Sequence, residues 1–142
     1  MVQIVDADVE IASAELLQEF GFDGITLFRN DLKGSFETEF FVDVHKRRAK
    51  HFARNILDVK PDDYAHVARG AHKIAAAAMK AFKADGITVQ QFNEPAGGQV
   101  VFHLHMHVMP RHDGVALLPP ASRKEDVKVL EDNATKLIAA LG

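Results

Sequence analysis

Three histidines stand at every second position of one short stretch, and they are the residues of this chain best suited to chemistry. Alternate side chains of an extended strand lie on one face of a sheet, so His103, His105 and His107 would line one side. The apolar residues before, between and after them would supply most of the packing: Val101, Phe102, Leu104, Met106 and Val108. With 8 histidines in 142 residues, composition predicts about 0.02 such triplets by chance. The alternative is a solvated face on a half-exposed edge strand.

A row of imidazoles at this spacing favours nucleophilic catalysis at phosphorus. A neutral ring nitrogen is a competent nucleophile when its other nitrogen is tied to a backbone carbonyl or a neighbour that fixes the tautomer. His105 is flanked on both sides, and repulsion between close cations leaves one member of the row neutral near neutral pH. A protonated neighbour and backbone amides would stabilise the negative charge that develops on phosphorus.

Glycines directly upstream could supply those amides. Gly97 and Gly98 tolerate positive φ and let the backbone approach a ligand closely. The N–H groups of Gly98, Gln99 and Val100 could therefore form a nest for a phosphate. An ordinary tight loop is the alternative, because two adjacent glycines are by themselves a weak signal.

Three histidines are also the protein ligands of several catalytic zinc sites. Neighbours in the row would be about 6.8 Å apart along a strand, close enough to share a metal, but His103 and His107 would be about 13.6 Å apart. A third ligand would have to be His45, His51 or His112. The chain has no cysteine, which excludes disulfides, thiolate nucleophiles and cysteine-based zinc sites. We therefore expect no metal site and no required cofactor.

Length and composition indicate one globular domain, residues 1–142. A chain of 142 residues with 47% hydrophobic content can bury one core and is too short to need two.

No apolar stretch approaches the roughly 18 residues of a membrane span, and the N-terminus lacks signal-peptide features, which favours a cytoplasmic protein without a membrane partner. The net charge of -3 gives no overall attraction to nucleic acid. We interpret the basic run from His45 to His51 as a solvated loop, with phosphate or nucleic-acid contact as the alternative.

The elements of the N-terminal part follow from hydrophobic periodicity. A helix is expected over residues 8–20, with Gly21 as its stop. Two strands should follow at 24–29 and 36–44, because both segments are rich in β-branched and aromatic residues. The segment 30–34 between them is typical of a hairpin connection.

Two helices are predicted in the rest of the chain. The longer one should begin at Pro61, which suits a first helical position, and close at Gly86, with an apolar stripe that packs on a sheet. A capping box from Ser122 to Glu125 should start the last helix. The apolar face of that helix consists of Val127, Leu130, Ala134, Leu137, Ile138 and Leu141.

The histidines themselves should lie on the second strand of a hairpin. Residues 87–92 are predicted as its first strand, and residues 100–109 as its second. A glycine-bearing loop at 93–99 would join them, and Pro110 would end the second strand.

The segment from Arg54 to Arg111 resembles the histidine triad (HIT) family. The family motif is His-apolar-His-apolar-His followed by two apolar residues, here His103-Leu-His-Met-His-Val-Met109. The preceding Gln91-Phe-Asn-Glu-Pro-Ala-Gly-Gly-Gln-Val-Val-Phe102 is similar to the strand and loop of the Hint branch, the purine nucleoside phosphoramidases and related nucleotide hydrolases. The resemblance divides the chain into a divergent part (1–50), a best-matching core (51–111) and a tail with the C-terminal helix (112–142).

This resemblance implies an α+β, two-layer fold, with an antiparallel sheet, a long helix and a C-terminal helix, in a homodimer that binds a purine nucleoside monophosphate. It also implies that His105 attacks the α-phosphorus and forms a nucleotidyl-histidine intermediate, which water later resolves. His103 and His107 would hold the phosphate, relay protons and orient the central ring. The implied nucleotide contacts are Asn93, Gly98, Gln99 and the backbone at Val100, where eukaryotic members often have Ser or Thr.

The N-terminal third departs from the family pattern. Members usually have an acidic residue after a strand for the ribose hydroxyls, then a Gly-His-apolar-apolar-Val-Ile-Pro-Lys strand before the long helix. The segment Phe41-Val-Asp-Val44 can match either element. Asp43 is then a candidate ribose ligand and His51 or His45 a candidate fourth histidine, but the two registers cannot both hold.

The function implied by the resemblance is that of a hydrolase or transferase acting at the α-phosphate of a purine nucleotide, on a phosphoramidate or an adenylylated compound. A dinucleoside polyphosphate hydrolase is the alternative of the same class. The altered N-terminal third leaves a second alternative, a catalytically idle nucleotide-binding or protein-interaction module. A zinc-binding protein is the third.

Overall fold

The structure is a computed structural model, and it describes residues 2–5, 8–11, 24–30, 37–43, 53–117 and 127–142. The elements in chain order are β1 (Val2–Val5), β2 (Asp8–Ile11), β3 (Gly24–Asn30), β4 (Glu37–Asp43), α2 (Pro61–Phe82), β5 (Gly86–Gln90), the 3-10 turn η1 (Pro95–Gly97), β6 (His105–Arg111) and α3 (Val127–Leu141). The described strands form one sheet in the order β1-β2-β3-β4-β6-β5, and all neighbours are antiparallel. The expected α+β fold is confirmed.

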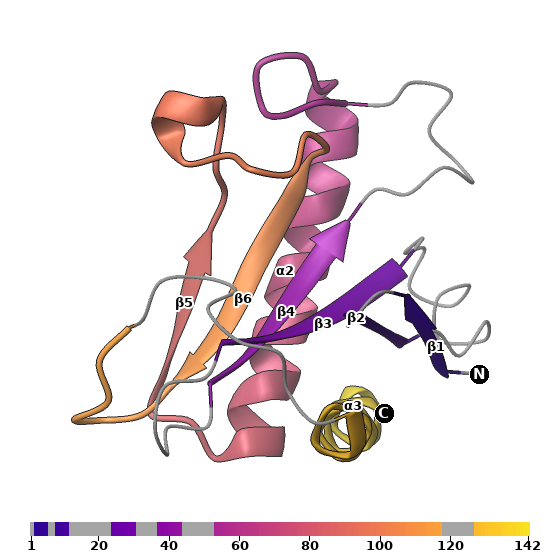
Figure 1. Cartoon of the computed structure of the whole chain (residues 1–142), viewed down its shortest axis with the longest axis vertical. Coiled ribbons are helices and arrows are strands. Elements are labelled where there is room, and N and C mark those ends of the chain that lie inside the picture. Colours follow the sequence, from indigo (N-terminus) through magenta and orange to yellow (C-terminus); the bar gives the residue numbers. More distant parts are fainter. Residues whose placement is uncertain (1, 6–7, 12–23, 31–36, 44–52, 118–126) are drawn as a thin grey trace.

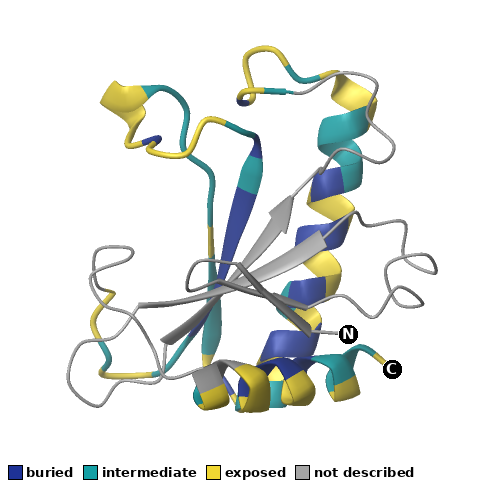
Figure 2. Cartoon of the chain, turned by 45° about the vertical axis from the view of Figure 1, so that its right-hand side comes forward, coloured by how far each residue is buried: buried dark blue, intermediate teal, exposed yellow. Residues whose placement is uncertain are grey.

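The helices cover one face of this sheet. In Figure 1, α2 runs behind β4 and β6. The second helix, α3, packs near the lower end of α2 and also contacts β2 and β3. The buried core between the layers consists of Val67, Ala71, Ile74, Ala77, Ala78, Leu104, Met106, Val108, Ala134 and Leu137. Figure 2 shows that α2 has alternating buried and exposed stretches along its length, as expected for an amphipathic helix with one face on a sheet. This packing fixes β6 firmly against α2.

The long helix starts where the sequence predicts. Pro61 occupies the first turn, and Asp62 and Asp63 follow it there, which complements the positive end of the helix dipole. The predicted end at Gly86 is wrong. The helix stops at Phe82 because Lys83 adopts a left-handed conformation (φ 50°), and its N–H donates to the carbonyl of Met79. Gly86 instead begins β5.

The N-terminal elements are partly corrected by the structure. Residues 8–11 form β2 and not the start of a helix, because they pair with β1 on one side and β3 on the other. The rest of that predicted helix, 12–20, and its stop at Gly21 lie outside the described residues. The two predicted strands are confirmed as β3 and β4, which pair from Gly24 with Asp43 through to Asn30 with Glu37.

The predicted hairpin that carries the histidines is confirmed as β5 and β6, but its second strand has different bounds. β6 begins at His105, because the N–H of Leu104 leaves the sheet and donates to the carbonyl of Ala53 at 2.9 Å. Pro110 does not end the strand. It pairs with Ile87 of β5, and the pairing with β4 stops at Val108, so the missing proline N–H interrupts no ladder there.

The C-terminal helix is confirmed as α3, while its predicted capping box, 122–125, lies outside the described residues. Within the described ranges, neither α2 nor α3 combines the length and apolarity that a bilayer-crossing helix requires.

Candidate active site at the histidine row

The three imidazoles of the row lie next to one another. The ring centroids of His103 and His105 are 4.9 Å apart, and those of His105 and His107 are also 4.9 Å apart. The intervening Leu104 and Met106 are buried in the core against α2. The prediction of a histidine face opposite an apolar face is therefore confirmed.

The alternative, a solvated face on an edge strand, is excluded because β6 has β4 on one side and β5 on the other. One detail of the prediction itself is wrong. Val101 and Phe102 do not pack in the core: they are 52% and 39% exposed, because the chain has not yet entered the sheet at these positions.

The central ring has a defined tautomer. Nδ1 of His105 lies 2.8 Å from the carbonyl oxygen of His103. A carbonyl can only accept, so Nδ1 carries the proton and, in the neutral ring, the lone pair is on Nε2. This is the arrangement that a nucleophilic imidazole requires.

His107 is the most buried member of the row, at 5% exposure. Its ring meets that of Phe92 edge-on, with centroids 5.1 Å apart and an interplanar angle of 79°. Edge-to-face contacts at this distance are favourable arrangements of two rings. The third ring is thus fixed by packing, and the central ring by a hydrogen bond.

Asp43 lies directly opposite His105 in the register of β4 and β6. Directly opposed residues of an antiparallel pair share a face of the sheet, about 4.5–5.5 Å apart at Cα. The structure therefore places this candidate ribose ligand at the register position nearest the central histidine. The other candidates from the N-terminal part, His45 and His51, lie outside the described residues.

The glycine loop is folded on itself. The N–H groups of Gly97 and Gln99 donate to the carbonyl of Glu94, and that of Gly98 to the carbonyl of Pro95, each at 3.0 Å. The amides of Gly98 and Gln99 consequently point into the turn and do not form the outward nest that the sequence suggests. Gly98 has a φ of 89°, which explains the glycine at this position. The roles of Gly98 and Gln99 in nucleotide binding remain predictions.

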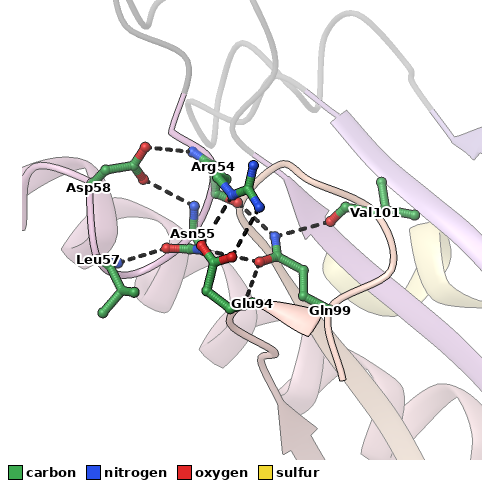
Figure 3. Close-up of polar contacts among 7 residues, drawn as sticks. All are labelled: Arg54, Asn55, Leu57, Asp58, Glu94, Gln99 and Val101. Carbon is green, nitrogen blue, oxygen red and sulfur yellow. Dashed lines mark hydrogen bonds and ion pairs between the residues drawn. The ribbon is translucent and has the colours of Figure 1, made fainter. Parts of the chain in front are cut away.

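Sequence reasoning missed a polar cluster beside this loop, drawn in Figure 3. We call Arg54, Asn55, Glu94 and Gln99 the loop clamp. Arg54 donates from Nε and Nη2 to the two carboxylate oxygens of Glu94, at 3.1 and 3.0 Å. Asn55 donates from Nδ2 to Glu94 Oε1 at 2.8 Å and to Gln99 Oε1 at 3.0 Å. The clamp joins the segment before α2 to the loop before the histidines.

Two predicted nucleotide contacts use their amide groups inside the protein. Gln99 is 4% exposed, and its Nε2 donates to the carbonyls of Arg54 and Val101 at 2.8 and 3.1 Å. Asn93 accepts on Oδ1 from the N–H of Ile56 and from Gln91 Nε2, both at 2.9 Å. Val100, in contrast, is 84% exposed. Any contact that Gln99 or Asn93 makes with a ligand must compete with these hydrogen bonds.

The carboxylates around the clamp are held in the charged form. Hydrogen bonds from Arg54, and secondly from Asn55, lower the pKa of Glu94 below its usual range. Backbone N–H groups of Asn55 and Arg54 lower the pKa of Asp58, which accepts them at 3.0 and 3.1 Å. The clamp is therefore an ion-paired structure at neutral pH.

The candidate metal ligands do not converge in the described part of the chain. No group of three His, Asp or Glu residues lies close enough there to hold an ion. His112, one of the predicted third ligands, lies instead with its Nδ1 3.8 Å from Asp85 Oδ2, just after the C-terminal end of β6. His103 precedes the opposite end of that strand.

An antiparallel sheet with one helical layer, and three adjacent imidazoles where an interior strand of that sheet begins, defines the histidine triad class of proteins. Residues 37–114, more than half of the chain, match the HIT domain. The chain therefore belongs to the HIT domain family. The matched range includes β4 and Asp43 but not β1 to β3.

Solved structures agree with this assignment. A Hit-like protein involved in cell-cycle regulation from Bartonella henselae is 38% identical and superposes with a TM-score of 0.65, covering 82% of this chain and 79% of that one. A Zn-bound histidine triad family protein from Mycobacterium smegmatis is 28% identical, with a TM-score of 0.61 and coverages of 83% and 76%.

Among curated sequences, an uncharacterized HIT-like protein of Saccharolobus solfataricus is 39% identical over 56 residues. The match covers 39% of this chain and 40% of that protein, so the chain spans less than half the length of this relative.

Proposed function

We propose that the protein is a nucleotide hydrolase or transferase that acts at the α-phosphate of a purine nucleoside phosphoramidate or an adenylylated compound. The observation that carries this proposal is the hydrogen bond between His105 Nδ1 and the His103 carbonyl. It leaves the neutral ring with its lone pair on Nε2, the nitrogen that would attack phosphorus. The substrate class follows the resemblance of residues 91–102 to the Hint branch.

The proposed reaction has two displacement steps. In the first, the bond between His105 Nε2 and phosphorus forms, the bond from phosphorus to the leaving group breaks, and the leaving amine or oxygen takes up a proton. In the second, water attacks phosphorus, the Nε2–phosphorus bond breaks, and the nucleoside monophosphate leaves, while the proton that the water gives up replaces the one taken by the leaving group. His103 and His107 flank the central ring at 4.9 Å, a spacing that suits proton transfer and charge stabilisation at the phosphate.

The nucleotide would lie along the histidine face of β6. We propose Asp43 as the ribose ligand, because its register position is opposite His105. The exposed Val100 and the loop residues Asn93 and Gly98 would contact the ribose and phosphate from the other side. On the same family basis we expect a homodimer and no required cofactor.

The test is a hydrolysis assay with adenosine phosphoramidate, AMP-lysine, Ap3A and Ap4A, with the released AMP measured by chromatography. His105→Ala and His105→Asn should lower kcat at least about a thousandfold while the protein stays folded, since the variants lack the nucleophile. His72→Ala, at an exposed position of α2, is the matched control and should keep wild-type turnover. Rapid quenching should trap a nucleotidyl adduct on wild-type protein by mass spectrometry.

Each outcome selects one function. Preference for Ap3A or Ap4A would make the protein a dinucleoside polyphosphate hydrolase. Nucleotide binding by calorimetry without AMP release would leave a binding module. Near-normal turnover of a folded His105→Ala protein would eliminate the covalent route.

A further inference from the structure

We infer that Asn55 is a positioning residue for the histidine row: through the loop clamp it holds the peptide group that orients the ring of His105. The kinetic part of this inference rests on the proposed function, and the structural part does not. Asn55 lies 48 or more positions before the row in sequence and touches none of the three rings in the contacts described. Its influence would act entirely through backbone that it fixes.

The key peptide group is the one between His103 and Leu104. Its carbonyl accepts from His105 Nδ1 at 2.8 Å, and its N–H donates to the carbonyl of Ala53 at 2.9 Å. The C=O and N–H of a trans peptide point in opposite directions. The bond to Ala53 on one side therefore directs the carbonyl toward His105 on the other.

Ala53 directly precedes the two clamp residues Arg54 and Asn55, so whatever fixes that segment also fixes the peptide. Asn55 is 1% exposed and uses each polar atom of its side chain. Nδ2 donates to Glu94 and Gln99, and Oδ1 accepts from the N–H of Leu57 at 3.0 Å. Buried polar groups in such networks are costly to leave without partners, which makes the arrangement rigid.

Gln99 completes the connection from the loop side. Its Nε2 donates both to the carbonyl of Arg54 and to that of Val101, and so bridges the two segments. Its Oε1 accepts from Asn55 Nδ2 and from the N–H of Glu94. Figure 3 shows Asn55 and Gln99 side by side, with Glu94 beside both and Val101 on the far side of Gln99. Removal of the Asn55 amide would therefore loosen both the segment before α2 and the loop that contains Glu94 and Gln99.

The expected kinetic signature differs from that of a substrate ligand. Asn55 is 1% exposed and its side-chain atoms are hydrogen-bonded within the protein, so we expect no direct contact with substrate and a KM within about threefold of wild type. A displacement of about 1 Å at a nucleophile can cost about a hundredfold in rate. We expect Asn55→Ala to lower kcat about tenfold to a hundredfold.

The experiment compares Asn55→Ala and the isosteric Asn55→Asp with Asn133→Ala. Asn133 is a buried asparagine of α3, so its variant controls for loss of stability away from the clamp. Each protein is first shown to be folded by circular dichroism. Then kcat and KM are measured, and the protonated ring nitrogen of His105 is identified by 15N NMR of histidine-labelled protein.

A rescue variant adds a second test. In Asn55→Asp the new carboxylate lacks the Nδ2 donors and faces Glu94, so repulsion should open the clamp. Adding Glu94→Gln supplies an amide that can donate to that carboxylate and removes the repulsion. The double variant should recover part of the kcat that Asn55→Asp loses.

The inference is supported if the Asn55 variants lose kcat and shift His105 away from the Nδ1-protonated tautomer while Asn133→Ala does neither. It is overturned if a folded Asn55 variant keeps wild-type kcat and tautomer, or if Asn133→Ala shows the same loss per folded molecule. Should wild-type protein not hydrolyse nucleotides, the proposed function fails, and the NMR comparison still decides the role of Asn55.

Discussion

Arg54 meets Glu94 in a two-pronged ion pair, with Nε–Oε1 and Nη2–Oε2 distances of 3.1 and 3.0 Å. The same guanidinium lies over the ring of Phe102, 4.2 Å from its centroid. One side chain thus contacts both the start of the glycine loop and the residue just before the histidine row. The side chains of Arg54 and Glu94 are 47% and 42% exposed, so water screens the attraction between them. We therefore expect this ion pair to orient the loop and to add little stabilising energy.

Acid should weaken this pair at a pH set by Glu94. The pKa of Glu94 is lowered in the folded protein, first by Arg54 and then by Asn55, from an ordinary value of 4.5. Its contribution to stability is therefore complete above about pH 4.5 and is lost as the pH falls through the folded-state pKa. NMR titration of the side-chain carboxyl should give a midpoint below 4.5, and Glu94→Gln should remove this part of the acid dependence of unfolding. A midpoint at or above 4.5 would contradict the pair in solution.

Asp58 should stabilise the turn that precedes α2. Its two carboxylate oxygens accept the N–H groups of Arg54 and Asn55, and Asp58→Ala leaves both donors without that partner. We expect a lower melting temperature for Asp58→Ala than for Glu131→Ala, a control at an exposed position of α3. Asp58→Asn should fall between wild type and Asp58→Ala because it keeps one acceptor oxygen. Equal melting temperatures for all variants would contradict this role.

The two adjacent glycines should respond differently to alanine. Gly98 has a φ of 89°, and an added Cβ would lie 3.3 Å from Phe92 Cδ1. Gly98→Ala should therefore cost about 1–3 kcal/mol of unfolding free energy. At Gly97 nothing lies within 4 Å of an added Cβ, so Gly97→Ala should change stability by about 0.5 kcal/mol or less. Urea unfolding of the pair measures the difference, and similar values for both would refute the loop conformation.

Core packing between α2 and β6 should dominate stability. Ile74 is fully buried, whereas Leu57 is 75% exposed. Ile74→Ala should lose about 2–5 kcal/mol through lost burial and the cavity left behind. Leu57→Ala removes a similar side chain from the surface and should change stability by about 0.5 kcal/mol or less. Chemical denaturation of both variants tests the placement of the core, and a large loss at Leu57 would show that this surface is covered in solution.

Several errors of the sequence-based predictions have a common physical cause. Residues 8–11 fit a helical period, yet pairing with strands on both sides makes them β2. Pro110 was expected to end its strand, but it is tolerated where β6 pairs only with β5. Local pattern does not say which neighbour a segment will have, and neighbours decide these cases.

By itself, the sequence determined that three imidazoles share a face, that a long helix begins at Pro61, and that a hairpin carries the row. These features depend on periodicity and on short-range backbone chemistry, which neighbouring residues encode. Only the tertiary structure decided that Asn55 meets Gln99, 44 residues away, and that Asp43 pairs with His105. Such contacts depend on the path of the whole chain, because hydrogen-bond partners far apart in sequence are brought together only when the sheet and α2 have packed.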